Sequence, residues 1–335
     1  MKNIFLISFF ILLNSCSSKG EEPVLETESP VEEVPFVESD STADIESDST
    51  TDSQSSSSSV ESFKIKQSWS QKPDGYERNV FYKYPENGNN NNPVAILLHG
   101  AGGTPQYELD ENSYLINHIL VAPEGYDRGW NIAKEETKAP DLDFIKKIIL
   151  HLKTFEKIDT DNISIIGGSN GAALVNQLLI ELESESFKKA VYKFCQLNAF
   201  QYREGSFWAR SNIDSEVHDL EVLPASNNRK ILSFAGTEDE ACIYYGGEGI
   251  NKYNFVNAEK AAFVWAKVFG YEGVQIENPI EEAAPLENFY RFSYLDGKVI
   301  HYKLQGAGHG WEQEYKWNDD GKRLGETIIK NFIEN

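Results

Sequence analysis

The chain has 335 residues, of which 40% are hydrophobic, and a formal net charge of −22 at pH 7. A chain of this length holds one large α/β domain or two small ones. Its acidity and its lack of a basic patch argue against nucleic-acid binding, because a phosphate backbone attracts clustered positive charge.

The N-terminal residues predict an export signal. Lys2 supplies a short positive region, and residues 4–13 form an apolar run that is too short to span a bilayer. Leu-Asn-Ser-Cys at 13–16 then resembles the lipobox of bacterial lipoproteins. That resemblance implies a signal peptide over 1–15 and a lipid on Cys16 that anchors the protein in the outer membrane of a bacterial cell envelope. A plain signal peptide whose last residues happen to include Cys16 is the alternative interpretation.

Residues 16–62 predict a disordered tether. They are rich in Glu, Asp, Ser, Thr and Pro, and 17–62 holds thirteen acidic residues and one lysine, which is more than half of the net charge of the chain. Such a stretch has too little apolar surface to offset the entropy of ordering. Residues 17–22 also resemble the acidic surface-export signals of Bacteroidetes lipoproteins, while solvated charge explains the same residues equally well.

From residue 63 to 335 strand-like and helix-like segments alternate, which predicts a single α/β domain with a mostly parallel central sheet flanked by helices. A hairpin is expected from 63–69 and 78–85, with its turn at Lys72-Pro73-Asp74-Gly75. Further strands are expected at 94–98, 118–123, 162–167, 190–197, 230–235 and 298–304, and helices at 141–157, 170–183, 258–269 and 322–334. Residues 200–229 and 272–296 show no clear period, and we expect insertions there that shape the functional site.

The most informative local pattern is Gly-Gly-Ser-Asn-Gly at 167–171. A β-branched, apolar strand runs into it, and a helix of small residues follows at once. Gly-x-Ser-x-Gly in this setting is typical of a nucleophile elbow, where the serine occupies a strained turn and both glycines allow close backbone approach. The five-residue pattern alone arises by chance in about one chain of this length in ten. Its position between a strand and a helix predicts Ser169 as a nucleophile.

A serine nucleophile needs a base to take its proton and an acid to orient that base. A later strand ends in Gly-Thr-Glu-Asp at 236–239, and another ends in a histidine between two glycines, His309. Both follow strand ends, where open α/β sheets place their chemistry. We therefore predict His309 as the base and Asp239 as the acid, with Glu238 as the alternative acid, in the chain order of α/β-hydrolases.

The backbone N–H groups of Ala101 and Asn170 form the predicted oxyanion hole. Asn170 directly follows the serine, and Ala101 lies in a loop of small residues after the strand at 94–98. We expect His99, in the same loop, to hold that loop by hydrogen bonds rather than to act as a base.

These motifs also support a family resemblance. Together with Gly-Tyr-Glu-Arg at 75–78, Trp130-Asn131 and Gly-His-x-Trp at 308–311, they resemble the feruloyl esterase and polyhydroxybutyrate depolymerase group of α/β-hydrolases, over about residues 74–312. The resemblance implies an α/β-hydrolase fold and a serine carboxylesterase that needs no metal and no cofactor. We expect a monomer that acts on a small ester or on a polysaccharide ester, such as a feruloyl or acetyl group. Trp130 and Trp311 are the candidate substrate-binding residues.

Two departures from the family pattern keep other functions open. Ala101 stands where depolymerases often have cysteine, and the chain has no module for a solid polyester, so a polyhydroxyalkanoate or oligoester depolymerase is the alternative. A serine peptidase with the same three residues is a rival enzyme. A non-catalytic carbohydrate-binding or adhesin module on a hydrolase scaffold is the alternative from another class.

Cys195 and Cys242 are the cysteines besides Cys16. In an exported protein they either form one disulfide or remain as two buried free thiols. The sequence leaves both states open.

Overall fold

The computed structural model describes residues 59–86, 88, 90–183, 185–225, 229–282, 288–311 and 319–335. The expected signal peptide, Cys16 and the expected tether as far as residue 58 lie outside the described residues. The first strand, β1 (Val60–Trp69), begins before the expected end of the tether at residue 62. Its first residues have exposed side chains, so they join the sheet through backbone pairing of Val60 with Lys83 rather than through an apolar pattern.

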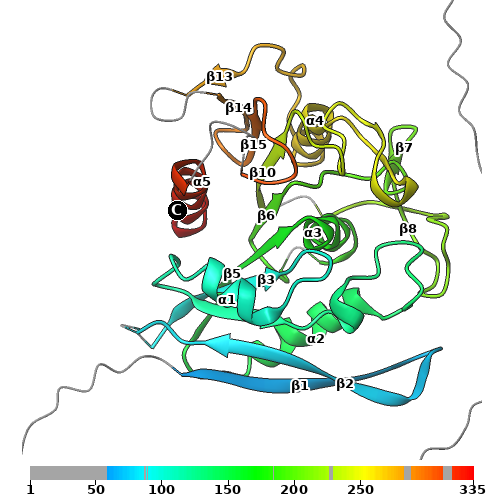
Figure 1. Ribbon diagram of the computed structural model, residues 1–335, viewed down its shortest axis with the longest axis vertical. Coiled ribbons are helices and arrows are strands. Elements are labelled where there is room, and N and C mark those ends of the chain that lie inside the picture. The colour runs from blue at the N-terminus through cyan, green and yellow to red at the C-terminus, as the bar shows by residue number, and fades with distance from the viewer. Residues whose placement is uncertain are drawn as a thin grey trace, which may run out of the picture. The chain divides into compact units, whose positions relative to one another are not determined.

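A ten-stranded sheet forms the centre of the domain (Figure 1). In spatial order its strands are β1, β2 (Lys72–Lys83), β4 (Ile119–Pro123), β3 (Asn92–Leu98), β5 (Ile158–Gly168), β6 (Lys189–Lys193), β10 (Lys230–Gly236), β15 (Val299–Leu304), β14 (Phe289–Tyr294) and β13 (Ile280–Glu281). All strands from β4 to β15 in this order run parallel, and antiparallel strands extend the sheet at both edges. The predicted mostly parallel α/β sheet is confirmed.

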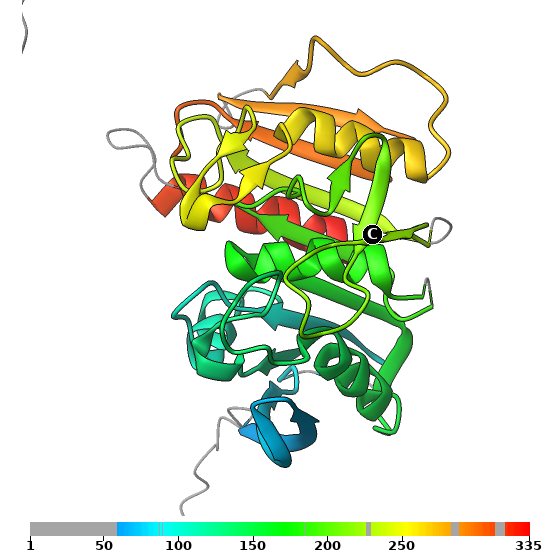
Figure 2. The same cartoon turned by 90° about the vertical axis from the view of Figure 1, so that its right-hand side faces the viewer.

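Helices cover both faces of this sheet (Figures 1 and 2). On one face α2 (Asp141–Leu152), α3 (Asn170–Glu181) and α4 (Ala258–Val268) pack against side chains such as Ile96 and Ile165. On the other face α1 (Pro105–Glu111) and α5 (Asp319–Glu334) pack against side chains such as Leu97 and Ile166. Because consecutive strand residues point to opposite faces, both faces need apolar side chains, and the central strands are therefore continuous apolar runs.

Smaller elements occupy the loops between the strands. They are η1 (Tyr126–Arg128), β7 (Tyr202–Arg203), β8 (Ser206–Ala209), β9 (Leu220–Val222), β11 (Gly247–Glu248), η2 (Ile250–Lys252) and β12 (Asn254–Phe255). β7, β8 and β9 form a separate three-stranded sheet within the insertion expected at 200–229. No helix among the described residues has the length and apolar character needed to cross a membrane.

The expected insertion at 272–296 is wrong in part, because it contains β14. This strand pairs with β15 through a hairpin that turns at Leu295 to Lys298, and its side chains Phe289, Phe292 and Tyr294 are buried. Asp296-Gly297 in the turn is a pair typical of β-hairpins. The aromatic residues before it are irregularly spaced and show no strand period, so the sequence did not predict this strand.

The first hairpin is present, but its turn lies at Ser70 and Gln71. Trp69 pairs with Lys72, whereas Gln67 pairs with Tyr76, so residues 73–75 of β2 lie opposite the single residue Ser68 and bulge from the ladder. Proline has no N–H to donate and Gly75 has a φ of 94°, and both properties suit a bulge as well as a turn.

Two predicted elements end earlier than expected. α2 ends at Leu152 rather than 157, because the chain turns at Lys153 and Thr154, whose N–H groups bond to Ile149 and His151. β6 ends at Lys193 rather than 197, because Phe194 has a φ of 60°, which lies outside the extended region.

Candidate active site

Ser169 occupies a strained turn between β5 and α3. Its φ of 51° and ψ of −118° are unfavourable for any residue with a side chain. A Cβ atom on Gly167 would overlap the carbonyl of Gly171, and one on Gly171 would overlap the carbonyl of Leu98. Only glycine fits at either position, so the sequence pattern corresponds to a backbone packed too tightly for side chains beside the serine.

A continuous series of hydrogen bonds joins Ser169, His309 and Asp239. His309 Nδ1 lies 2.8 Å from Asp239 Oδ2, and His309 Nε2 lies 2.8 Å from Ser169 Oγ. Because a carboxylate accepts hydrogen bonds, this contact keeps the proton on Nδ1 and leaves Nε2 to accept from the serine hydroxyl. The Asp239 side chain is fully buried, while 33% of the His309 side chain is exposed. His309 is therefore partly open to solvent, while the buried Asp239 carboxylate fixes its Nδ1 side.

The Asp239 carboxylate is fixed by its own loop. Its Oδ1 accepts the backbone N–H groups of Ala241 and Cys242, each at 2.8 Å, which leaves Oδ2 for His309. Glu238 is exposed, and its backbone N–H bonds to Ala307. Of the two acids that the sequence offered, Asp239 is the one that contacts the histidine.

Parallel strands bring these groups to one edge of the sheet. Ser169 follows β5, Asp239 follows β10 and His309 follows β15, so all three lie beyond the carboxyl ends of neighbouring or nearby strands. A Cβ atom on Gly236, at the end of β10, would overlap the carbonyls of Ala307 and Gly308. This close approach brings the acid loop against the histidine loop.

The loop after β3 carries Ala101 to the same edge. Among the described residues, neither the N–H of Ala101 nor that of Asn170, at the start of α3, donates to another residue. His99 Nε2 accepts the N–H of Gly125 at 3.0 Å, and His99 Nδ1 donates to the carbonyl of Gly100 at 2.7 Å. Burial lowers the pKa of His99, so the ring is neutral and fixes this loop, which is the role expected for it.

Trp130 is buried beside the elbow, and its binding of substrate stays a prediction. Only 1% of the residue is exposed, and its indole N–H donates to the carbonyl of His99 at 2.7 Å. Its backbone N–H donates to Asn170 Oδ1 at 2.7 Å, and Asn170 Nδ2 donates back to the Trp130 carbonyl at 3.2 Å. Trp130 therefore joins the loop after β3 to the elbow.

Sequence reasoning missed Arg128, which also holds the loop after β3. Its carbonyl accepts the N–H of Gly102 at 2.8 Å, and its guanidinium donates to the carbonyls of Gly102 and Gly103. These partners are far apart in the sequence, and no local pattern marks such contacts.

Trp311 is half-buried beside the histidine loop. Its ring meets Phe194 and Phe234 edge-on, each with centroids 5.0 Å apart, and it fills the space above Gly325 of α5. These contacts give the residue a packing role, and its binding of substrate stays a prediction.

Cys195 and Cys242 are both buried and both free thiols in this structure. A hydrogen bond to Cys195, together with burial, raises the pKa of the Cys242 thiol. The two thiols are therefore neighbours, and of the two states that the sequence left open, the structure has the reduced one.

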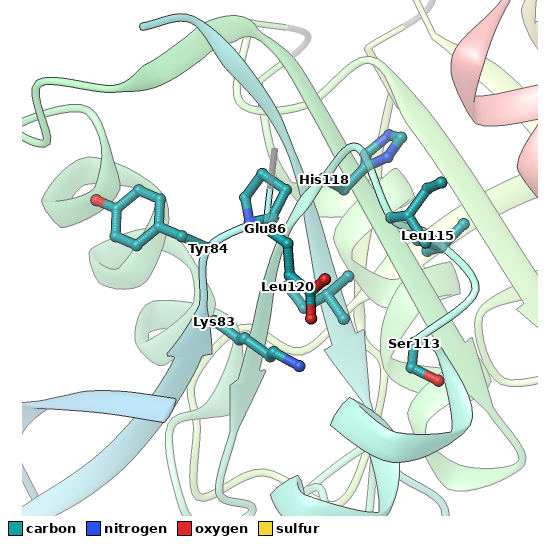
Figure 3. A pocket seen from close by; sticks show the side chains of 9 residues that line it. Lys83, Tyr84, Glu86, Ser113, Leu115, His118 and Leu120 are labelled. Carbon is teal, nitrogen blue, oxygen red and sulfur yellow. The ribbon is translucent and has the colours of Figure 1, made fainter. Parts of the chain in front are cut away.

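A hollow of about 290 Å³ lies at the amino end of the parallel strands, opposite the end that carries the candidate active site. Side chains from the end of β2, such as Lys83 and Glu86, line one side of it, and Ser113 and Leu115 line the other (Figure 3). It also contains His118, whose pKa burial lowers to about 4. None of the candidate site residues lies here. No group of three or more potential metal ligands gathers anywhere in the part of the chain that the structure describes.

Comparisons with known proteins agree with this architecture. No protein-family model matches the chain. Over 100 residues it is 29% identical to the curated protein named "Putative esterase NocK" of Nocardia uniformis subsp. tsuyamanensis. The aligned stretch covers 27% of this chain and only 29% of that relative.

Two solved structures resemble the chain more extensively. Acetyl xylan esterase from Aspergillus awamori superposes with a TM-score of 0.51 at 16% identity, over 76% of this chain and 94% of its own. The acylaminoacyl peptidase of Pyrococcus horikoshii gives a TM-score of 0.50 at 15% identity, over 82% of this chain and 41% of its own. Similarity at such low identity identifies the fold alone. The sheet order, the elbow and these superpositions together identify the described domain as an α/β-hydrolase fold, as the sequence predicted.

Proposed function

We propose that the protein is a serine carboxylesterase. The observation that carries this proposal is the series of hydrogen bonds from Asp239 through His309 to Ser169, with the serine on a strained elbow. A neutral imidazole with one nitrogen bonded to a carboxylate and the other to a serine hydroxyl is the arrangement that general-base activation of a nucleophile requires.

In the proposed reaction Ser169 Oγ attacks the ester carbonyl carbon while His309 Nε2 takes the hydroxyl proton. The carbonyl oxygen becomes an oxyanion that accepts hydrogen bonds from the N–H groups of Ala101 and Asn170, which have no other acceptor among the described residues. Charge develops there only in the transition state, so fixed donors at this point lower the barrier without stabilising the ground state equally.

Collapse of the tetrahedral intermediate breaks the bond to the alcohol, which receives the proton from His309, and leaves an acyl group on Ser169. Water then repeats the sequence, with His309 as its base, and releases the carboxylic acid and free serine. Asp239 keeps the imidazolium oriented in both steps, because two backbone N–H groups fix its other oxygen.

Feruloyl or acetyl esters on extracellular polysaccharides are the proposed substrates. Support comes from the sequence resemblance to the feruloyl esterase group and from the exposed edge of His309, which admits a bulky substrate. The test is turnover by the purified protein of p-nitrophenyl acetate, methyl ferulate, acetylated xylan, polyhydroxybutyrate and a peptide anilide. We expect hydrolysis of the first three. Hydrolysis of the anilide alone would make the protein a peptidase, and hydrolysis of none would favour a binding module.

We also propose that the protein is an outer-membrane lipoprotein held by a lipid on Cys16, which would place the esterase where it meets polymers. Labelling of cells with an alkyne fatty acid should mark the wild-type protein and leave Cys16→Ser unmarked. A wild-type protein without label would argue for a plain secretory signal, and equal labelling of both proteins would place the lipid on a residue other than Cys16.

A further inference from the structure

A hollow of about 150 Å³ lies beside the loop that the proposed oxyanion hole belongs to. Its lining includes Tyr76 from β2 and Glu124 to Arg128, which follow β4. Because β4 runs parallel to the strands that carry Ser169 and Asp239, this segment leaves the sheet at the same edge as they do. The hollow is thus a neighbour of the candidate active site.

Aromatic rings form one wall of the hollow. Tyr76 and Tyr126 meet edge-on with centroids 5.1 Å apart, and both contact the buried Trp69 behind them, at 6.1 Å and 5.1 Å. Tyr76 is 41% exposed although it is a large ring in a three-ring cluster. The Lys72 ammonium lies 5.8 Å from the centroid of both the Tyr76 and the Tyr126 ring, and the exposed part of the Tyr76 ring remains as an aromatic surface for the C–H face of a sugar ring.

Charged residues of the segment after β4, together with the buried Arg78, complete the lining of the hollow. The carboxylate of Asp127 is exposed and has no hydrogen-bond partner among the described residues, and Glu124 is half-buried. Asp127 and Arg128 both have positive φ, 53° and 56°, a costly conformation for residues other than glycine. The conformation is maintained by the bonds of Arg128 to Gly102 and Gly103.

We propose that this hollow binds one neutral pyranose unit of the polysaccharide that carries the ester, so that Tyr76 and Tyr126 contact the ring and Asp127 accepts hydroxyl hydrogen bonds. This inference rests on the proposed esterase function. The volume suits one sugar unit rather than an oligosaccharide, and a few polar groups beside apolar rings are the usual composition of a small-ligand site. We favour a neutral sugar because Arg78 and Arg128 line the hollow together with Glu124 and Asp127, so charge of one sign does not predominate there.

The hollow is connected to the oxyanion loop by the segment that separates them. Gly125 donates to His99, Arg128 bonds to Gly102, and Trp130 donates to the His99 carbonyl. A sugar that packs on Tyr126 and Asp127 therefore contacts the residues that hold this loop, and orients the attached ester toward Ser169 at the same time.

The test compares acetylated xylohexaose with p-nitrophenyl acetate, which has no sugar. For Tyr76→Ala in the full-length protein we expect KM for the oligosaccharide ester to rise about five- to tenfold, and kcat/KM for p-nitrophenyl acetate to stay within about twofold, because one aromatic contact is lost. Tyr76→Phe keeps the ring and should keep the wild-type KM. Tyr290→Ala is the matched control, because Tyr290 lies on β14 near the opposite edge of the sheet. This variant should change neither constant.

Binding of unesterified xylohexaose, measured by titration calorimetry, separates this inference from the esterase function. Weaker binding to Tyr76→Ala than to Tyr290→Ala supports the subsite even if no ester is hydrolysed. The inference is overturned if p-nitrophenyl acetate is hydrolysed normally while Tyr76→Ala leaves KM for the oligosaccharide ester unchanged. It is also overturned if polygalacturonate binds and xylohexaose does not.

Discussion

Two histidines at opposite ends of the same sheet have opposite surroundings. At the carboxyl end both ring nitrogens of His309 are bonded, one to Asp239 and one to Ser169, and a third of the side chain is exposed. At the amino end His118 is 2% exposed, and neither of its ring nitrogens has a hydrogen-bond partner among the described residues.

In the proposed mechanism this difference is the reason why His309, and not His118, acts as a base. Burial lowers the pKa of His118 to about 4 despite the opposing effect of the nearby Glu334 carboxylate, which makes no hydrogen bond to the ring among the described residues, so the ring stays neutral and contributes packing. His309 instead contacts a buried carboxylate, that of Asp239, which is the partner that the proposed mechanism requires. The acid partner and the access to substrate, rather than the histidine itself, distinguish the two ends.

The largest expected effect comes from removing that acid. Asp239→Asn keeps the shape of the side chain but should lower kcat for p-nitrophenyl acetate about 10⁴-fold, because the amide no longer holds the proton on Nδ1 of His309. Steady-state hydrolysis measures the loss. Glu238→Gln is the matched control and should retain wild-type kcat, since Glu238 is exposed. The reverse result for the two variants would assign the acid to Glu238.

A smaller effect is expected at Trp130, which bonds to His99 in the loop after β3 and to Asn170 beside the serine. Trp130→Phe removes the indole N–H that bonds to the His99 carbonyl and should lower kcat about tenfold, less than the roughly 10²- to 10³-fold cost of losing an oxyanion donor outright. KM for p-nitrophenyl acetate should stay constant. A raised KM with unchanged kcat would instead place Trp130 in the substrate pocket.

No change in activity is expected at His118, and the predicted effect there is on stability alone. Its folded pKa of about 4 lies below its ordinary value of 6.5, so the unfolded chain binds more protons between these values. The free energy of unfolding of the wild-type protein should therefore fall as pH drops from 6.5 to 4. In His118→Leu this fall should be smaller, by up to about 1.4 kcal/mol for each pH unit.

Urea unfolding of both proteins at pH 7, 5.5 and 4.5 measures this difference, with kcat at pH 7 unchanged in the variant. The charged neighbours of His118 are Glu334, Lys189 and Lys330, and they are the same in both proteins. Parallel pH profiles would show that His118 is not the titrating group.

The sequence was sufficient for the parts of the molecule whose signals are local. The central strands are apolar on both faces, and backbone carbonyls occupy the space that a Cβ atom on Gly167 or Gly171 would need. The residue types in the sequence therefore indicate both the sheet and the elbow. Asp239 and His309 could be predicted because each follows a strand end, and parallel strands bring such ends together.

Other parts depend on contacts between distant residues. Trp130 was expected in a pocket, yet it is buried because it bonds to His99, in the loop after β3, and to Asn170, at the start of α3. β14 was missed for a related reason, since pairing with β15 rather than an alternating pattern makes it a strand. The turn at Ser70 and Gln71 likewise reflects register between two strands, which turn residues alone do not determine.

The most direct test of the central claim is labelling with a fluorophosphonate, followed by mass spectrometry of the modified peptide. We predict a single adduct, on Ser169, that forms rapidly in the wild-type protein, far more slowly in His309→Ala, and not at all in Ser169→Ala. An absence of any adduct on the folded wild-type protein, or equal labelling of Ser169→Ala, would contradict the account.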